Sequence, residues 1–328
     1  MSLLDLPEQD AALVTGVLAR QRRALAKAIT LIESSRLDHQ ARARKVLEAL
    51  LPSTGKAIRI GISGVPGVGK STVIEALGIY LIEQGHRVAV LAIDPSSSIS
   101  GGSILGDKTR MELLSQRDEA FIRPSPASGA LGGVAHRTRE ALLLCEAAGF
   151  DVVIVETVGV GQSETAVAGM TDVFVLLQLP NAGDDLQGIK KGIVELADLV
   201  VFNKADIDPR AAEVACGQMR SALHMLRPLS MHWQIPVLKI SAAKKEGLTE
   251  FWQTIEKYRV CMQATSEFDS KRKHQALAWM WDMIETGLHQ QFREHPVIKR
   301  ELAGVADGVS QGKITPAAGA HQLLSYLK

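Results

Sequence analysis

The chain has 328 residues, close to half of them apolar, which is enough to bury the core of one large domain with appendages. Its 37 basic and 36 acidic residues nearly cancel, so the bulk charge excludes nucleic-acid binding driven by overall charge. Three widely separated cysteines fit neither a disulfide framework nor a metal knuckle. The N-terminus resembles neither a signal peptide nor a transit peptide, and no apolar run could span a bilayer, so we expect a cytoplasmic protein without membrane contact.

The first 55 residues are expected to form a helical extension. Leu25, Ile29 and Ile32 recur at helical spacing, and Asp38 is the predicted N-cap of a second helix. The segment also carries a basic cluster, for which a solvated helix face is favoured over a partner surface: Arg20, Arg22, Arg23 and Lys27.

The stretch from residue 56 to residue 260 alternates short apolar runs with helical patterns. Several runs are apolar throughout, which is typical of parallel strands covered on both faces. We therefore predict a doubly wound, mostly parallel α/β domain that binds its ligand at the carboxyl ends of the strands. The predicted strands are residues 58–63, 88–93, 119–123, 151–156, 173–178, 199–202 and 237–240.

A glycine-rich motif follows the first predicted strand. Residues 64–71 read GVPGVGKS, which matches G-x-x-x-x-G-K-[ST], and a helical pattern continues to Glu83. Glycines at such a turn let main-chain N–H groups surround a polyphosphate, and the helix N-terminus adds partial positive charge. Lys70 is predicted to reach the β- and γ-phosphates, and the Ser71 hydroxyl to bind Mg²⁺. The residues predicted to cradle the phosphates are Gly64, Val65, Pro66, Gly67, Val68, Gly69, Lys70, Ser71 and Thr72.

The second predicted strand ends in Asp94, and a Ser- and Gly-rich segment continues to Asp107. Beside a phosphate site, such a segment is predicted to be a switch that the γ-phosphate and Mg²⁺ order. Mg²⁺ keeps several waters that need acceptors, so Asp94 and Asp107 are predicted magnesium partners.

The fourth predicted strand ends in Glu156-Thr-Val-Gly159, at the place of the D-x-x-G motif of G-proteins. Glu156 is predicted to hold the magnesium, and the Gly159 N–H to sense the γ-phosphate. Lys70, Asp94 and Glu156 are thus the predicted catalytic residues.

No hydrolytic residue is evident in the sequence. Val160 stands where Ras-like proteins carry the Gln that orients the attacking water, and Gln162 is nearby but not equivalent. Some dimer-activated P-loop proteins carry a second, catalytic lysine directly after the first glycine of the motif. Val65 occupies that position here, so this mechanism is excluded. We expect slow intrinsic hydrolysis that a partner accelerates.

The sixth predicted strand ends in Asn203-Lys-Ala-Asp206, an N-K-x-D match. Guanine presents N1–H and a 2-amino group side by side, and one carboxylate can accept both, so Asp206 is predicted to select GTP over ATP. Asn203 is predicted to brace the base edge and the Lys204 stem to cover one face of the ring. After the seventh strand, a main-chain N–H within Ser241-Ala242-Ala243 is predicted to meet guanine O6.

The last residues, 261–328, change character. An apolar stripe at helical spacing consists of Leu277, Trp281, Ile284, Leu288 and Phe292. Thr315 is the predicted N-cap of a final helix. Such an arm packs on its own domain or pairs with a second chain, and its tryptophans favour an oligomer contact.

The chain as a whole resembles the MeaB/ArgK family of P-loop GTPases almost from end to end. The motifs that carry the resemblance are residues 64–71 (GVPGVGKS), 92–97 (AIDPSS), 156–164 (ETVGVGQSE), 179–185 (LPNAGDD) and 203–206 (NKAD). The resemblance implies a GTPase that serves as a G-protein chaperone of adenosylcobalamin-dependent methylmalonyl-CoA mutase. It implies that GTP hydrolysis is coupled to loading intact cofactor and releasing damaged cofactor. It further implies a homodimer formed through the C-terminal arm.

The resemblance also suggests a third switch in the loop 179–190. There Asp184 and Lys190, with Arg110 from the first switch region, would exchange ion pairs as the nucleotide changes.

Three other functions share parts of this pattern. A metal-insertion GTPase for another metalloenzyme should carry a Cys/His delivery site, and the sequence has no C-x-x-C. A scaffold that only binds GTP would lack multiple turnover. A kinase of a transport binding protein normally prefers ATP, and the N-K-x-D motif disfavours it.

Overall fold

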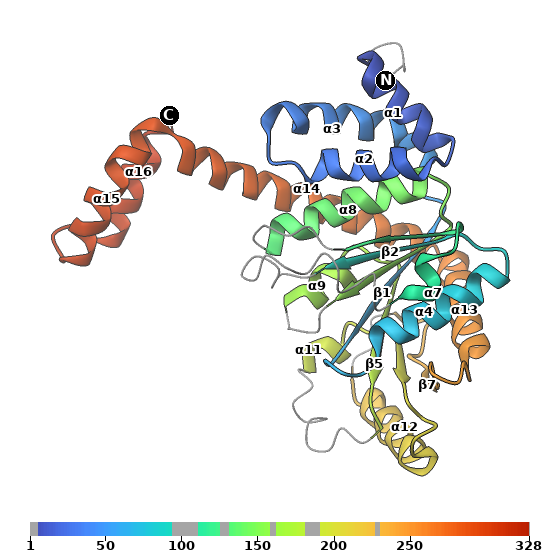
Figure 1. The fold of residues 1–328 in the computed structure, drawn as a ribbon. Coiled ribbons are helices and arrows are strands. Elements are labelled where there is room, and N and C mark those ends of the chain that lie inside the picture. Colours follow the sequence, from blue (N-terminus) through green and yellow to red (C-terminus); the bar gives the residue numbers. More distant parts are fainter. Residues whose placement is uncertain are drawn as a thin grey trace. The chain divides into compact units, whose positions relative to one another are not determined.

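The computed structural model describes residues 6–93, 111–124, 131–157, 162–180, 191–226 and 230–327. In these residues one parallel sheet has the strand order β3-β2-β4-β1-β5-β6-β7, which confirms the predicted doubly wound α/β fold (Figure 1). The strands are β1 (Ile58–Gly64), β2 (Val88–Ile93), β3 (Ala120–Arg123), β4 (Val152–Thr157), β5 (Val173–Gln178), β6 (Leu199–Phe202) and β7 (Val237–Lys239). The chain winds to one side of β1 with β2–β4 and to the other with β5–β7, so the topological switch point lies at β1.

Helices cover both faces of this sheet, and the strand residues alternate between them (Figure 1). On one face, β1 side chains such as Ile60 and Ile62 pack with α4 (Lys70–Glu83) and α13 (Leu248–Ala264). On the other, β4 side chains such as Val153 and Val155 pack with α8 (Leu131–Ala147) and α9 (Gln162–Ala168), while α12 (Pro209–His224) covers β6 and β7. Two short helices, α7 (Glu112–Ser115) and α11 (Lys191–Val194), lie between strands. Burial on both faces is why the strands are apolar throughout.

The N-terminal helices extend the core beyond α8. They are α1 (Glu8–Leu18), α2 (Arg22–Glu33) and α3 (Leu37–Leu50), followed by a 3₁₀ turn η2 (Leu51–Ser53). Leu25, Ile29 and Ile32 are buried as their spacing predicts. The predicted N-cap is wrong: Arg36 is the N-cap residue of α3, and Asp38 lies inside the first turn, where its carboxylate accepts hydrogen bonds from the Arg36 side chain. Aspartate is a common N-cap residue, which is why the sequence predicted a cap at Asp38. Nothing in the sequence indicated that Asp38 would instead pair with the Arg36 side chain.

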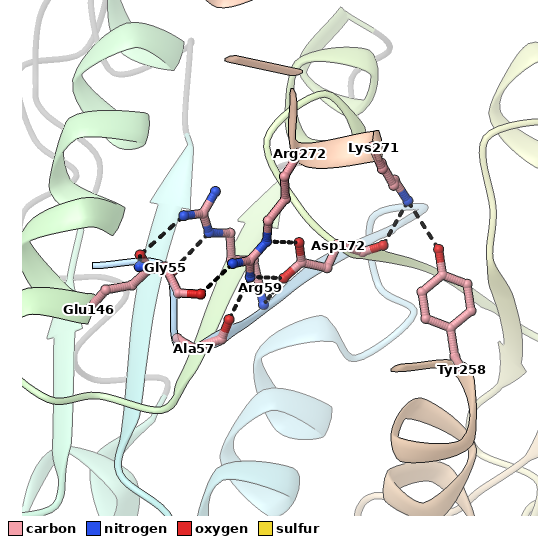
Figure 2. Close-up of polar contacts among 8 residues, drawn as sticks. All are labelled: Gly55, Ala57, Arg59, Glu146, Asp172, Tyr258, Lys271 and Arg272. Carbon is pink, nitrogen blue, oxygen red and sulfur yellow. Dashed lines mark hydrogen bonds and ion pairs between the residues drawn. The ribbon is translucent and has the colours of Figure 1, made fainter. Parts of the chain in front are cut away.

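A polar network lies at the N-terminal ends of β1 and β5 (Figure 2). The glycine-rich loop lies at the other end of β1. The Arg272 guanidinium donates to both oxygens of Asp172 at 2.7 Å and to the carbonyls of Gly55 and Ala57 at 2.6 Å. Asp172 precedes β5 and is buried, and its Oδ2 also accepts from the Arg59 main-chain N–H. The network joins the starts of β1 and β5 to the first turns of α14 (Glu267–Glu294).

Neighbouring polar groups extend this network (Figure 2). Arg59 donates to both carboxylate oxygens of Glu146 on α8, and Lys271 donates to the Asp172 carbonyl and to the Tyr258 hydroxyl. Each buried carboxylate is therefore paired and hydrogen-bonded, as its desolvation requires.

The chain divides into two compact units, residues 1–272 and 273–328. The second contains the rest of α14 together with α15 (Pro296–Ser310) and α16 (Pro316–Ser325), around a small core of Ile298, Val305 and Leu323. The predicted cap is confirmed, because the Thr315 hydroxyl accepts from the Ala318 N–H. The sequence-based division at residues 55 and 260 stays a prediction. In the described ranges no helix is long and apolar enough to cross a membrane.

Candidate nucleotide-binding site

The glycine-rich loop lies between the end of β1 and the start of α4. A Cβ on Gly64 would lie 2.5 Å from the main-chain oxygen of Leu177 on β5, so the close approach of two central strands requires glycine there. Gly69 precedes the first residue of α4 with φ of +93°, and a Cβ on it would lie 2.7 Å from the Asn203 side-chain nitrogen. A side chain at Gly64 or Gly69 would therefore clash with residues that are distant in the sequence, Leu177 and Asn203.

Lys70 begins α4 and turns back over the loop. Its ammonium donates to the carbonyl oxygens of Gly64 at 2.7 Å and Val65 at 3.3 Å, and the residue is only 9% exposed. A buried cation at a helix N-terminus, held against a glycine-rich turn, is a suitable group to meet a polyphosphate.

The next helical residue, Ser71, contacts the end of β4. Its hydroxyl donates to Oε1 of Glu156 at 3.3 Å, and the Glu156 residue is 9% exposed. Both groups offer oxygen, the ligand atom that Mg²⁺ prefers, so this pair fits a magnesium ion.

Asn203, at the end of β6, ties two loops together. Its side-chain nitrogen donates to the Val68 carbonyl at 2.9 Å, and its side-chain oxygen accepts from the Ala242 N–H at 3.1 Å. The residue is 2% exposed. Sequence reasoning assigned Asn203 to the base edge and missed this tie, because Val68 lies 135 residues away and only the fold brings it near.

Lys204 and Asp206 complete the N-K-x-D turn. Lys204 has φ of +61°, a left-handed backbone conformation that residues other than glycine rarely adopt. Its ammonium donates to the Gly67 carbonyl at 2.9 Å. Its stem therefore spans from the turn to the glycine-rich loop. A hydrogen bond from Ser241 lowers the pKa of Asp206, with help from Lys244, whose ammonium lies 3.7 Å away. Asp206 is thus a carboxylate at neutral pH, able only to accept.

The loop after β7 closes this end of the site. The Ser241 and Ala242 N–H groups donate to the Glu246 carbonyl and to Asn203. Within the described structure the Ala243 N–H makes no hydrogen bond, so it is available to a ligand.

The fold brings Lys70, Ser71, Glu156, the N-K-x-D turn and the loop after β7 to the carboxyl ends of β1, β4, β6 and β7. Several other predicted site residues lie outside the described residues: Asp94, Asp107, Arg110, Gly159, Asp184 and Lys190.

A parallel sheet with a G-x-x-x-x-G-K-S loop on its central strand and an N-K-x-D turn beside it defines a P-loop GTPase. The family model described as "Methylmalonyl Co-A mutase-associated GTPase MeaB" matches residues 25–297, and the chain belongs to this family.

Individual relatives agree with this assignment. The chain is 47% identical to the mouse mitochondrial methylmalonic aciduria type A homolog, over 96% of this chain and 79% of the mouse protein. It is 46% identical to GTPase ArgK of Escherichia coli K12, over 94% of this chain and 93% of that protein. A solved structure titled "Crystal structure of LAO/AO transport system kinase" superposes with a TM-score of 0.78 at 38% identity, covering 98% of this chain and 99% of that one.

Proposed function

We propose that the chain hydrolyses GTP with Mg²⁺ and acts as a chaperone of adenosylcobalamin-dependent methylmalonyl-CoA mutase, loading intact cofactor and releasing damaged cofactor. The observation that carries the proposal is the site itself, in which a buried lysine, a Ser–Glu oxygen pair and an ionised Asp206 lie at one edge of the sheet. The mutase as client is supported by the family to which the chain belongs, which is described as a methylmalonyl-CoA mutase-associated GTPase.

Each side chain of the site has a distinct task in this mechanism. Lys70 neutralises charge on the transferring phosphoryl group, and Ser71 and Glu156 would hold the magnesium ion, which supplies further charge neutralisation. Glycine-rich-loop N–H groups and the start of α4 orient the phosphates. Asp206 accepts from guanine N1–H and the 2-amino group, while Asn203 and Lys204 keep the base site and the phosphate site at a set separation through Val68 and Gly67.

Replacing Asp206 with Asn is expected to lower kcat/KM for GTP about a hundredfold, because a carboxylate that accepts two donors is replaced by an amide. Hydrolysis of xanthosine triphosphate should rise, since xanthine offers an acceptor where guanine has the amino group. Steady-state assays with GTP, XTP and ATP measure this. Asp208→Asn is the control, because Asp208 caps α12 through the Ala211 N–H and Asn caps equally well. An unchanged preference for GTP in Asp206→Asn would contradict the base assignment.

The mutase should accelerate hydrolysis. Purified mutase is expected to raise kcat for GTP at least tenfold, and not for ATP, because the sequence carries Val160 in place of a water-orienting Gln. Turnover is measured with and without the mutase, and heat-denatured mutase serves as control. If native mutase does not change the turnover, with or without cobalamin, the result would contradict the mutase as client. It would not contradict the GTPase activity.

A homodimer through the C-terminal arm is part of the proposal. Leu277, Trp281 and Leu288 on α14 are each more than half exposed, although they form an apolar stripe. Trp281→Glu is expected to shift the protein from dimer to monomer in sedimentation velocity, because a charge would be desolvated in the contact. Thr286→Glu is the control, because it introduces the same charge at an exposed position on the opposite face of the same helix. A monomeric parent protein, or a Trp281→Glu protein that stays dimeric, would contradict the proposed contact.

A kinase of a transport binding protein is the second candidate, because the superposable structure carries a transport-system kinase title. The ionised Asp206 of the N-K-x-D turn favours guanine over adenine and therefore favours the GTPase over the kinase. Phosphorylation of a purified transport binding protein from [γ-³²P]ATP, exceeding that from GTP, would favour the kinase.

A further inference from the structure

A buried pair of hydroxyl groups lies directly beneath the candidate nucleotide site. Thr157 Oγ1 donates to Ser63 Oγ at 2.9 Å, and each residue is 1% exposed. Ser63 immediately precedes Gly64, the first glycine of the loop, and Thr157 immediately follows Glu156. The hydrogen bond therefore joins the two strands at the last residues before their functional loops begin.

The backbone pairing of these strands ends one residue earlier. The β1–β4 register runs from Ile58 opposite Val152 to Ile62 opposite Glu156. Beyond that pair β1 still pairs with β5 through Ser63 and Gly64, and β4 still pairs with β2 through Thr157, but β1 and β4 no longer pair with each other. The hydroxyl pair thus continues the connection between β1 and β4 where the main-chain pairing of these two strands has stopped.

Alternation along the strands places the hydroxyl pair and the magnesium pair on opposite faces. Ile60 and Ile62 pack on the face of α4, so Gly61 and Ser63 belong to the face of α9, and Thr157 lies on that face with Val153 and Val155. Packing there is tight: a Cβ on Gly61 would lie 2.7 Å from a methyl group of Val167. Glu156 projects on the α4 face, where its carboxylate accepts from Ser71.

We propose that Ser63 and Thr157 are positioning residues for the metal-binding carboxylate. Their hydrogen bond keeps the end of β4 at a set separation from β1, and it thereby keeps Glu156 within reach of Ser71 at the start of α4. The inference rests on the proposed magnesium role of Glu156. It predicts that loss of the hydroxyl pair weakens the use of Mg²⁺ while leaving base recognition unchanged.

The test compares Thr157→Val, which keeps the shape and removes the hydroxyl, with Thr157→Ser, which restores it. Loss of a buried hydrogen bond corresponds to about a five- to tenfold change, so Thr157→Val should raise the free Mg²⁺ concentration for half-maximal GTP hydrolysis by that factor. Thr157→Ser should stay within about twofold of the parent protein. Ser63→Ala is expected to act in the same direction as Thr157→Val, and the double variant should be no worse than Thr157→Val, because one bond is lost in each.

A second measurement does not depend on turnover. Release of the fluorescent nucleotide mant-GDP in excess Mg²⁺ should be about five- to tenfold faster in Thr157→Val, and the rates in EDTA should agree among all variants. Thr171→Val is the matched control: Thr171 is also fully buried on the α9 side, but its hydroxyl donates to the Val167 carbonyl. Its Mg²⁺ dependence should equal that of the parent protein.

Glu156→Gln separates the two levels of the proposal. A large rise in the Mg²⁺ requirement of Glu156→Gln, with Thr157→Val behaving like Thr171→Val in both assays, would overturn the positioning role and leave the magnesium site intact. Unchanged Mg²⁺ dependence in Glu156→Gln would overturn the metal role, and the positioning role with it. Faster release in EDTA as well as in Mg²⁺ would show that the pair only supports the fold.

Discussion

Replacing Lys70 with alanine is expected to lower kcat/KM for GTP hydrolysis by about a thousandfold, which is the largest effect on activity that the site predicts. The ammonium is 9% exposed and lies over the glycine-rich loop, bonded to the carbonyls of Gly64 and Val65. In a water-poor site, a fixed positive charge stabilises the charge that develops during phosphoryl transfer far more than it would in solvent. Single-turnover hydrolysis with saturating enzyme measures the loss at the chemical step.

The control for this variant is Lys239→Ala, because Lys239 is an exposed lysine on β7 that pairs with Glu213. It removes the same charge from the same unit and should leave hydrolysis within about twofold, as exposed ion pairs contribute little. Circular dichroism of both variants checks that the fold is kept. A Lys70→Ala protein within tenfold of Lys239→Ala would contradict the assignment of Lys70 to the phosphates.

Replacing Arg272 with methionine is expected to destabilise the first unit by about 3–5 kcal/mol, the largest effect on stability that the structure predicts. Methionine keeps much of the apolar stem, but Asp172, which is 1% exposed, would lose the guanidinium that contacts both of its oxygens. The carbonyls of Gly55 and Ala57 would lose a donor as well. Among the described residues, the Arg59 main-chain N–H would remain as the donor to this carboxylate.

Hydrogen exchange is the suitable measurement, because it reports on the unit that contains the network rather than on the whole chain. Peptides from β1 and β5 should lose protection together, since the network joins the starts of these two strands (Figure 2). Arg117→Met is the control in the same unit, as Arg117 is about half exposed and its nitrogen lies 3.7 Å from Glu119. It should cost about 0–1 kcal/mol. Equal protection in the two variants would show that the buried network contributes no more than a surface pair.

Much of the fold and part of the site follow from local patterns. The predicted strand ranges agree with the observed strands to within one residue at each end, because strands buried on both faces are apolar throughout and stand out in the sequence. The glycine-rich loop and the N-K-x-D turn are contiguous motifs that carry their chemistry in adjacent residues. The helix predicted over residues 71–83 is observed from Lys70 to Glu83, and the Thr315 cap is observed as predicted, because both follow from neighbouring residues.

Those local patterns could not predict contacts between residues that are distant in the sequence. Asp38 has the residue type of an N-cap, but the Arg36 side chain engages it inside the helix. Asn203 bonds to Val68, and Thr157 bonds to Ser63, across 135 and 94 residues. A hydroxyl or an amide looks the same in a sequence whether it meets solvent, a ligand or another strand.

The sequence by itself determined the order of strands and helices along the chain, the glycine-rich loop and the class of nucleotide. Each of these depends on the periodicity or identity of neighbouring residues. Only the tertiary structure decided which residues hold those loops in place and how Arg272 binds the starts of β1 and β5. These are contacts of buried polar groups, whose energies depend on geometry and desolvation at partners that the fold brings together.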